Sequence, residues 1–345
     1  MGKDSKGNGI PPRELKRSIN LFQAVMYGVG LILGAGIYVI IGDVAAIAGN
    51  AMWISFIVAS IIALFTGLRY AELSSIYPKS AAEYVYAKNV FGSHFIALVV
   101  GCLIIFVAVV SAATVVLGFS GYFTSIFFPQ FNPILVAIVL ILALSFVNFY
   151  GISESVWMNI TFTFIELIGL LIIILAGFWI GSPSNTNYFE MPDKISGLSE
   201  PSALFMTGTI LGGAGLIFFA YYGFENIVNI ADETKNPVKV IPKALLISIA
   251  VTSAIYILVA ISTSALVEWK AMSLSEAPLS LAAEKAFGGQ GIIILSFIAL
   301  FATSNTALMM LISGSRIVYG ISKEESFPNW HSLKYTIYRN QKIMS

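Results

Sequence analysis

Long runs of apolar residues alternate with short polar stretches along the whole chain. A helix needs about 20 apolar residues to cross the hydrocarbon core of a bilayer, which is ~30 Å thick. Runs of this length predict eight membrane-spanning helices, at residues 20–47, 51–76, 94–124, 132–150, 156–181, 204–230, 243–267 and 289–319. We therefore expect an all-α, polytopic membrane protein whose main partner is the lipid bilayer.

The composition supports a membrane protein and excludes several other classes. Hydrophobic residues make up 57% of the chain and charged residues 11%, whereas a soluble domain carries roughly 25% charged residues. The net charge of +1 gives no reason to expect a nucleic-acid partner. A single cysteine, Cys102, excludes an internal disulfide, and the distant His94 and His331 predict no metal site. We expect no cofactor and no cleaved leader.

The positions of lysine and arginine predict the orientation in the membrane. With the N-terminus in the cytoplasm, the basic residues outside are Lys194, Lys270 and Lys285, and the other 16 of the 19 lie inside. Cytoplasmic loops carry an excess of basic residues. Both termini are therefore predicted to be cytoplasmic, in a protein of the plasma membrane.

The first span contains glycines where a helix is expected to break. Residues 34–36 read Gly-Ala-Gly and lie about 15 residues from the cytoplasmic end, which is ~22 Å along a helix and near the middle of the membrane. Two earlier glycines, Gly28 and Gly30, fit a break or close helix packing equally well.

The sixth span repeats this pattern from the other side of the membrane. It enters from outside, and residues 219–223 (Phe-Ala-Tyr-Tyr-Gly) lie at a similar depth. Two broken helices that run in opposite directions are typical of transporters built from inverted repeats. Their free N–H and C=O groups suit the carboxylate and the ammonium group of an amino acid.

Three segments resemble the amino acid–polyamine–organocation superfamily of permeases over about residues 15–330. The first segment is Gly34-Ala35-Gly36-Ile37-Tyr38 with Gly42. The second is Phe218-Phe219-Ala220-Tyr221-Tyr222-Gly223-Phe224-Glu225-Asn226, followed by Asp232-Glu233-Thr234-Lys235-Asn236-Pro237 and Ile241-Pro242-Lys243-Ala244. The third is Ser315-Arg316 with Ser326-Phe327-Pro328. The resemblance implies the leucine-transporter-type fold, an inverted repeat of five plus five helices with a substrate site between the first and sixth.

The resemblance also implies which residues bind the substrate. The backbone N–H groups of residues 34–36 would hold its carboxylate, and carbonyls of the two broken helices would hold its amino group. Phe219 stands at the place of the family's aromatic gate. The candidate binding residues are Ile32, Gly34, Ala35, Gly36, Phe219, Ala220, Tyr222 and Gly223.

Ionisable residues inside spans are rare and are candidates for function. Glu166 lies about ten residues into the fifth span, ~15 Å deep. Some relatives have a lysine near this place that takes part in proton coupling, so the role does not transfer directly. Glu166 is either a proton carrier or a neutral structural glutamate. Glu225 follows the break in the sixth span and is a candidate for proton coupling, gating or structural support.

Other polar residues also allow two interpretations each. Asn305 and Thr306 in the eighth span either line the site, as part of a sodium position, or join helices by hydrogen bonds. Four charged residues near the cytoplasmic interface form either a gate or ordinary solvated helix ends: Arg69, Asp232, Glu233 and Arg316.

The predicted helices divide the chain into four parts. Residues 1–19 form a cytoplasmic segment, residues 20–181 the first repeat of five helices, residues 204–319 a second repeat of three, and residues 320–345 a basic tail. Eight of the expected ten core helices are therefore present. A truncated or frameshifted reading frame is one interpretation of this shortage.

Together these features predict an amino-acid permease that works by alternating access, with proton symport or exchange. The site has no surplus acid beyond Glu225, which favours neutral amino acids. The alternative is a permease remnant or a membrane sensor without transport activity. We expect no enzyme, because no nucleophile–base pair lies at membrane depth.

Overall fold

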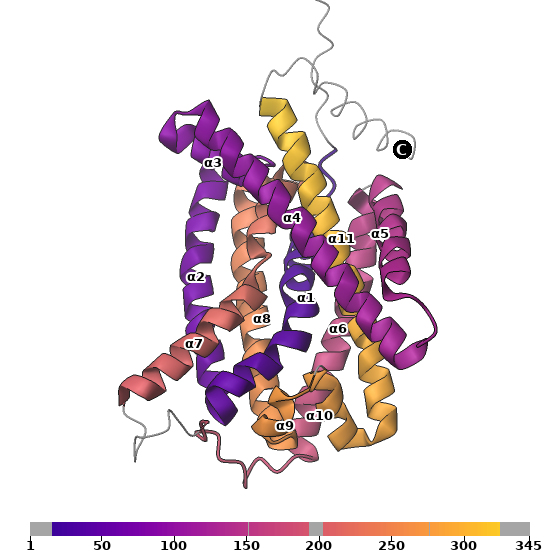
Figure 1. The fold of residues 1–345 in the computed structure, drawn as a ribbon. Coiled ribbons are helices and arrows are strands. Elements are labelled where there is room, and N and C mark those ends of the chain that lie inside the picture. The colour runs from indigo at the N-terminus through magenta and orange to yellow at the C-terminus, as the bar shows by residue number, and fades with distance from the viewer. Residues whose placement is uncertain (1–15, 151, 193–202, 276, 325–345) are drawn as a thin grey trace, which may run out of the picture.

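The computed structural model describes residues 16–150, 152–192, 203–275 and 277–324. These residues form a bundle of long helices (Figure 1). In chain order the elements are α1 (Leu21–Ala48), η1 (Gly49–Ala51), α2 (Met52–Ile76), α3 (Ala82–Phe91), α4 (His94–Tyr122), η2 (Phe123–Phe127), α5 (Pro133–Tyr150), α6 (Ile152–Trp179), α7 (Ala203–Tyr221), η3 (Phe224–Glu233), α8 (Pro237–Leu266), α9 (Trp269–Ser273), α10 (Pro278–Phe287) and α11 (Gly289–Glu324).

Each predicted span corresponds to a helix of the bundle. Seven stretches of the described helices are long and apolar enough to cross a membrane, and the fourth predicted span, α5, carries a shorter apolar stretch, Pro133–Phe149. The chain is therefore a multi-pass, all-α membrane protein. Of the predicted tail 320–345, the first five residues continue α11. The rest of the tail and residues 1–15 lie outside the described residues, and the division into two repeats stays a prediction.

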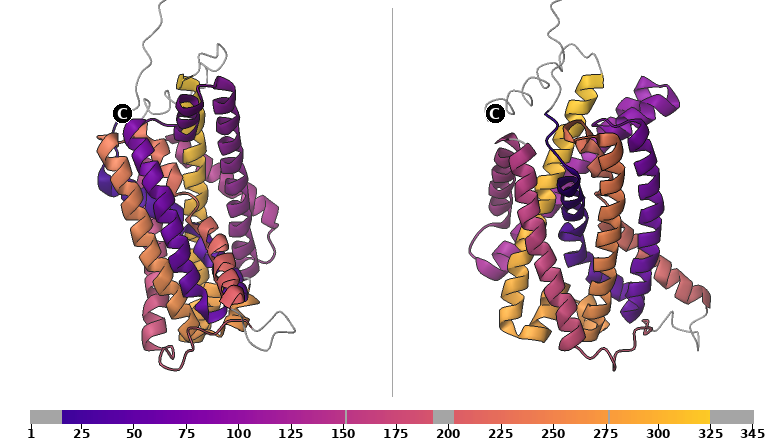
Figure 2. Two further views of the ribbon diagram at one scale, coloured as in Figure 1. Left: turned by 90° about the vertical axis from the view of Figure 1, so that its left-hand side faces the viewer. Right: turned by 180° about the vertical axis from the view of Figure 1, so that it is seen from behind.

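Helix α1 occupies the middle of the bundle and packs against α6, α7, α8 and α11. Helix α2 packs along α8 on one side, and α4 crosses the bundle obliquely and packs against α11 (Figures 1 and 2). The start of α1, the whole of α3 and the end of α11 lie at one end, which we call the N-terminal end. Helices α9 and α10 lie at the opposite end.

Local signals at its two ends set the limits of α1. The side chain of Asn20 accepts a hydrogen bond from the Gln23 amide, and the Gln23 side chain accepts one from the Asn20 amide, both at 3.0 Å. This reciprocal arrangement satisfies two N–H groups that the first turn leaves without partners. The helix ends at Gly49, whose φ of 60° suits a residue without a Cβ.

Large apolar side chains cover the outside of the bundle. Phe65 on α2, Phe95 on α4 and Trp179 at the end of α6 are 67%, 75% and 77% exposed. A water-facing surface would leave these rings without favourable contacts, whereas lipid tails solvate them well. The exposure of such residues supports the conclusion that most of the surface faces lipid.

The two early glycines of α1 allow close helix packing. A Cβ on Gly28 would lie 2.3 Å from the Ile227 side chain and 2.5 Å from the Ser248 hydroxyl. A Cβ on Gly30 would lie 2.2 Å from the Thr163 hydroxyl and 2.4 Å from the Asn159 amide nitrogen. Of the two explanations that the sequence left open, the structure selects packing for both glycines, because both keep helical backbone angles.

Replacing Gly30 with alanine is therefore expected to destabilise the bundle by about 1–3 kcal/mol, the usual cost of overpacking a filled core. The matched control is Gly208→Ala on α7, where an added Cβ meets nothing within 4 Å. The control is expected to be neutral or to stabilise by up to about 1 kcal/mol, since alanine favours helix. Thermal unfolding of the purified variants in detergent measures both, and equal stability of the two variants would contradict the packing.

Candidate functional site

Helix α1 bends sharply at one residue near its middle. Gly34 has φ −35° and ψ −147°, which is outside the helical range. The bend turns the Ala35 amide out of the helical hydrogen-bond pattern, and its N–H donates to the Thr306 hydroxyl of α11 at 3.1 Å. The predicted break over residues 34–36 is thus confined to Gly34, because Thr306 supplies the acceptor that lets the helix resume at once.

The second break separates α7 from η3. Helix α7 ends at Tyr221, and Gly223 has φ 124°, a backbone angle that residues with a Cβ rarely adopt. The chain then continues as the 3₁₀ helix η3, which packs against α1, α8 and α11. The structure therefore has the two broken helices beside each other: a Cβ on Gly36 would lie 3.2 Å from the Cα of Ala220.

A cavity of about 520 Å³ lies where the breaks meet, and we call it the central cavity. Of the eight candidate binding residues, six line it: Ile32, Ala35, Gly36, Phe219, Ala220 and Tyr222. Gly34 and Gly223 are not among the lining residues, since they form the bends themselves. The α4 wall is Phe106, Val107, Val110, Ser111, Thr114, Val115, Gly118 and Tyr122, and α11 adds Thr303, Thr306 and Met310.

The walls of the central cavity are mostly apolar and include no charged side chain. Polar groups come from hydroxyls such as those of Ser111, Thr114 and Thr306, and from the backbone at the two breaks. A volume of this size, apolar walls and a few converging polar groups are the usual features of a small-molecule site. The aromatic ring of Phe219 is 68% exposed and stacks on Tyr222 with centroids 6.3 Å apart.

Backbone carbonyls at the breaks already have partners within the protein. The Tyr222 amide donates to the Phe219 carbonyl at 3.1 Å. The buried Tyr256 hydroxyl of α8 donates to the Ile32 carbonyl and lies 3.4 Å from that of Ala220. This hydroxyl joins both broken helices to α8. A substrate amino group at the Ile32 carbonyl would therefore share it with Tyr256, which the sequence did not predict.

Glu166 is completely buried between α6 and α11. The Asn305 amide donates to one of its carboxyl oxygens at 3.0 Å, and the other oxygen, Oε2, has no partner among the described residues. Asn305 also donates to Thr163 at 3.2 Å and accepts from Asn159 at 3.0 Å. Asn305 thus joins helices, whereas its neighbour Thr306 lines the central cavity.

Glu225 supports the break that precedes it. Its carboxylate accepts hydrogen bonds from the Gly223 amide at 2.9 and 3.2 Å and from the Asn226 side chain at 3.1 Å. Asn226 in turn accepts from the Ser313 hydroxyl of α11. These bonds satisfy a backbone N–H that the broken helix leaves free, as a buried polar group requires.

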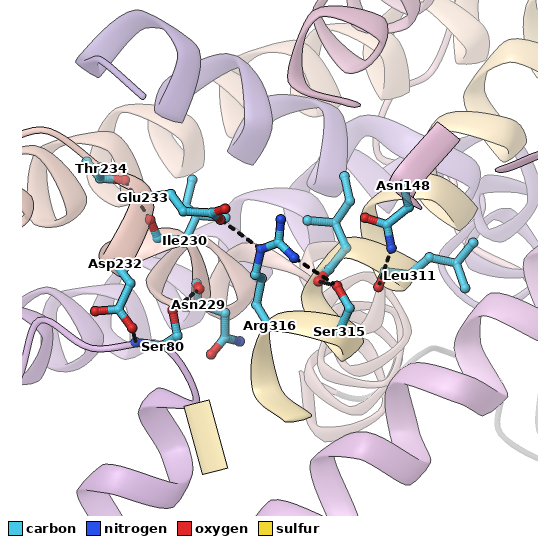
Figure 3. A network of polar contacts seen from close by, with 11 residues as sticks. Ser80, Asn148, Asn229, Ile230, Asp232, Glu233, Thr234, Leu311, Ser315 and Arg316 are labelled. Atoms are coloured by element: carbon cyan, nitrogen blue, oxygen red, sulfur yellow. Dashed lines mark hydrogen bonds and ion pairs between the residues drawn. The ribbon is translucent and has the colours of Figure 1, made fainter. Parts of the chain in front are cut away.

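A polar network closes the N-terminal end of the bundle (Figure 3). Its centre is the ion pair of Arg316 on α11 with Glu233 at the end of η3, 2.7 Å apart, with side chains 4% and 1% exposed. Asp232 accepts from the Ser80 amide at 3.4 Å and pairs with Lys323 at 3.6 Å. The Glu233 carbonyl also accepts from the amide of Ile19 at 3.0 Å.

Of the four charged residues predicted near this interface, the structure joins three in one network and leaves the fourth apart. Arg69 lies on the outside of α2, where it pairs with Glu72 at 3.3 Å, and the two side chains are 81% and 61% exposed. The sequence missed several members of the site: Tyr256 and the α4 hydroxyls of Ser111 and Thr114. Hydroxyls within an apolar span are a weak signal, because they also bond their own helix backbone.

Comparison with known proteins identifies the family. Residues 19–336 match the amino acid permease family. The chain belongs to this family. It is 28% identical to the branched-chain amino acid permease of Bacillus subtilis, over 92% of this chain and 69% of that protein. It is also 28% identical to human cationic amino acid transporter 4, over 91% of this chain and 51% of that protein.

A third relative, the methylthioribose transporter of Bacillus subtilis, is 29% identical over 92% of this chain and 69% of that protein. The family and these relatives are transporters rather than enzymes. The predicted resemblance, the polytopic all-α fold and the assignment to amino-acid permeases are thereby confirmed. The names of the relatives differ in the substrate that they carry, so the family alone leaves the substrate open.

Proposed function

We propose that the chain carries neutral amino acids with apolar side chains across the plasma membrane by alternating access. The observation that supports this best is the central cavity, which combines two helix breaks with apolar walls and no charged lining residue. A cationic side chain would enter it without a counter-charge and against apolar walls, which is costly. The branched-chain substrate of the Bacillus subtilis relative is of the kind that we propose.

The two breaks would hold the charged ends of the substrate. The N–H groups of residues 34–36 begin the second half of α1, where the helix dipole favours a carboxylate. The carboxylate would share the Ala35 N–H with the Thr306 hydroxyl. The carbonyls of Phe219 and Tyr222, near the end of α7, suit an ammonium group. The substrate would share the Phe219 carbonyl with the Tyr222 amide and the Ile32 carbonyl with Tyr256. Phe219 would cover the bound substrate as an aromatic gate.

Protons are the proposed coupling ion, and Glu166 and Glu225 are candidates to carry them. Glu166 is buried with one carboxyl oxygen free of partners among the described residues, which suits a neutral, protonated acid. We also propose that the N-terminal end faces the cytoplasm, because 16 of the 19 basic residues lie on that side of the predicted spans. The Arg316–Glu233 network would then be the cytoplasmic gate, closed in this conformation.

Binding of radiolabelled leucine to the purified protein tests the substrate class. Unlabelled isoleucine or valine is expected to displace leucine at least about ten times more effectively than lysine or arginine, which corresponds to ~1.4 kcal/mol. Equal competition by lysine would contradict the neutral substrate. Uptake into proteoliposomes with a pH gradient then distinguishes a transporter from a sensor, which would bind leucine but move none.

A further inference from the structure

Exposed lysines mark the place where α8 begins, at the N-terminal end of the bundle. Lys239 and Lys243 lie four residues apart on α8, and both are exposed. Residues at this spacing are neighbours on one face of a helix. Lys235, which is also exposed, lies two residues before the first turn. The start of α8 therefore presents one row of positive charge to its surroundings.

The same face of α8 continues with apolar residues. Ile247 and Val251 follow Lys243 at the same spacing of four, and they are 41% and 40% exposed. Exposed apolar residues on a membrane-spanning helix face acyl chains, whereas lysines near the end of such a helix reach the headgroup region. The change from apolar to basic along this row therefore places the lysines at the level of the lipid headgroups.

A second basic segment is held against the start of α8 by backbone hydrogen bonds. The Lys235 amide donates to the Ile19 carbonyl at 2.8 Å, and the Ile19 amide donates to the Glu233 carbonyl at 3.0 Å. The exposed Lys16 and Arg17 lie directly before this contact in the chain. Two distant parts of the chain thus bring basic residues to one place, which we call the basic surface: Lys16, Arg17, Lys235, Lys239 and Lys243.

The basic surface has no acidic counterpart among the described residues. None of its five side chains forms an ion pair with a described acid. The acids next to it in the chain, Asp232 and Glu233, pair with Lys323 and Arg316 instead (Figure 3 shows the second pair). Folding therefore leaves the positive charge of the basic surface uncompensated, so an anionic partner fits it.

We propose that the basic surface binds the headgroups of anionic phospholipids such as phosphatidylglycerol. Ammonium and guanidinium groups form strong hydrogen bonds with phosphate oxygens, and basic clusters beside a membrane-spanning helix attract anionic lipids. The acyl chains of the same lipid would lie against Ile247 and Val251. A free phosphate ion would use only the basic part of this row, so the combination of basic and apolar residues favours a lipid.

Such a lipid would connect segments that the closed N-terminal end holds together. The basic surface combines the segment before α1 with the junction of η3 and α8, and Glu233 at this junction is the partner of Arg316. A headgroup bound across both segments would stabilise the closed network. Lipid binding itself does not depend on the proposed transport activity, so each can fail without the other.

Native mass spectrometry of the purified full chain, released from micelles that contain phosphatidylglycerol or phosphatidylcholine, tests the proposal. The wild type is expected to bind phosphatidylglycerol at least about tenfold more tightly than phosphatidylcholine, because each basic residue near an anionic surface contributes roughly fivefold. The double variant Lys239→Gln/Lys243→Gln is expected to bind phosphatidylglycerol at least about tenfold more weakly than the wild type.

Two further double variants serve as controls. Lys270→Gln/Lys285→Gln removes the same charge at the opposite end, from α9 and α10, and is expected to bind phosphatidylglycerol like the wild type. Lys239→Arg/Lys243→Arg keeps the charge of the basic surface and is expected to keep the binding. Should Lys239→Gln/Lys243→Gln fail to fold, each single glutamine variant is expected to lose roughly fivefold in affinity.

The proposal is overturned if Lys239→Gln/Lys243→Gln binds phosphatidylglycerol as tightly as the wild type, or if the glutamine variants at the two ends lose the same affinity. Displacement of the lipid by inorganic phosphate at constant ionic strength would also overturn it, because the ligand would then be a free anion. Thermal unfolding in the same micelles tests the link to the closed end: phosphatidylglycerol is expected to raise the Tm of the wild type more than that of Lys239→Gln/Lys243→Gln, and equal shifts would contradict this link.

Discussion

Replacing Gly36 with tryptophan is expected to abolish leucine binding to the purified protein, with a loss of affinity of at least about a hundredfold. Gly36 lines the central cavity beside the second break, where a Cβ alone would lie 3.2 Å from both the Cα and the Cβ of Ala220. An indole at this position would fill the space between the broken helices and separate them. Equilibrium binding of radiolabelled leucine measures the effect.

The matched control is Gly215→Trp on α7. Gly215 also lies in a glycine-rich part of a broken helix, but it does not line the cavity, and an added Cβ meets nothing within 4 Å. This variant is expected to bind leucine like the wild type. Saturable binding that survives Gly36→Trp unchanged would show that the substrate site lies elsewhere.

Replacing Arg316 with alanine is expected to destabilise the protein by about 3–5 kcal/mol, the usual cost of removing one member of a buried ion pair. The partner, Glu233, is completely buried and lies 2.7 Å from the guanidinium group. Without this group the Glu233 charge stays buried, and η3 loses one of its polar attachments to α11. Thermal unfolding in detergent measures the loss of stability.

Arg69→Ala is the control, because the Arg69 side chain is 81% exposed and its ion pair with Glu72 lies on the surface. Exposed pairs contribute about 0–1 kcal/mol, so this variant is expected to unfold close to the wild type. Equal destabilisation by the two changes would contradict the assignment of Arg316 to the closed N-terminal end. A double variant with Glu233→Gln should be more stable than Arg316→Ala alone, since it removes the buried charge that Arg316 no longer balances.

The helices could be predicted from the sequence because lipid imposes a simple rule. A span must be long, apolar and internally hydrogen-bonded, and all eight predicted runs are helices of the bundle. The two breaks were predicted at nearly the right places, because glycine weakens a helix wherever it stands. The extent of the first break was not predictable, since it depends on Thr306, 271 residues away from Ala35.

In the candidate site, too, some residues could be predicted from the sequence, whereas their contacts could not. The resemblance to the permease superfamily implied eight binding residues from the sequence alone, and six of them line the cavity. The partner of the Ile32 carbonyl is Tyr256, 224 residues further along the chain, and that of Glu166 is Asn305, 139 residues away. Arg69 and Arg316 looked alike as basic residues near one interface, and only packing made one a surface residue and the other a buried one.

The sequence by itself therefore determined the membrane class, the spans, the approximate positions of the breaks in the chain and the family, because each depends on local composition or on a contiguous motif. Only the tertiary structure decided which polar side chains meet: Asn305 with Glu166, and Arg316 with Glu233. The physical reason is that burial and partners determine the charge of an ionisable group inside a membrane protein. Both arise when helices far apart in the chain pack together.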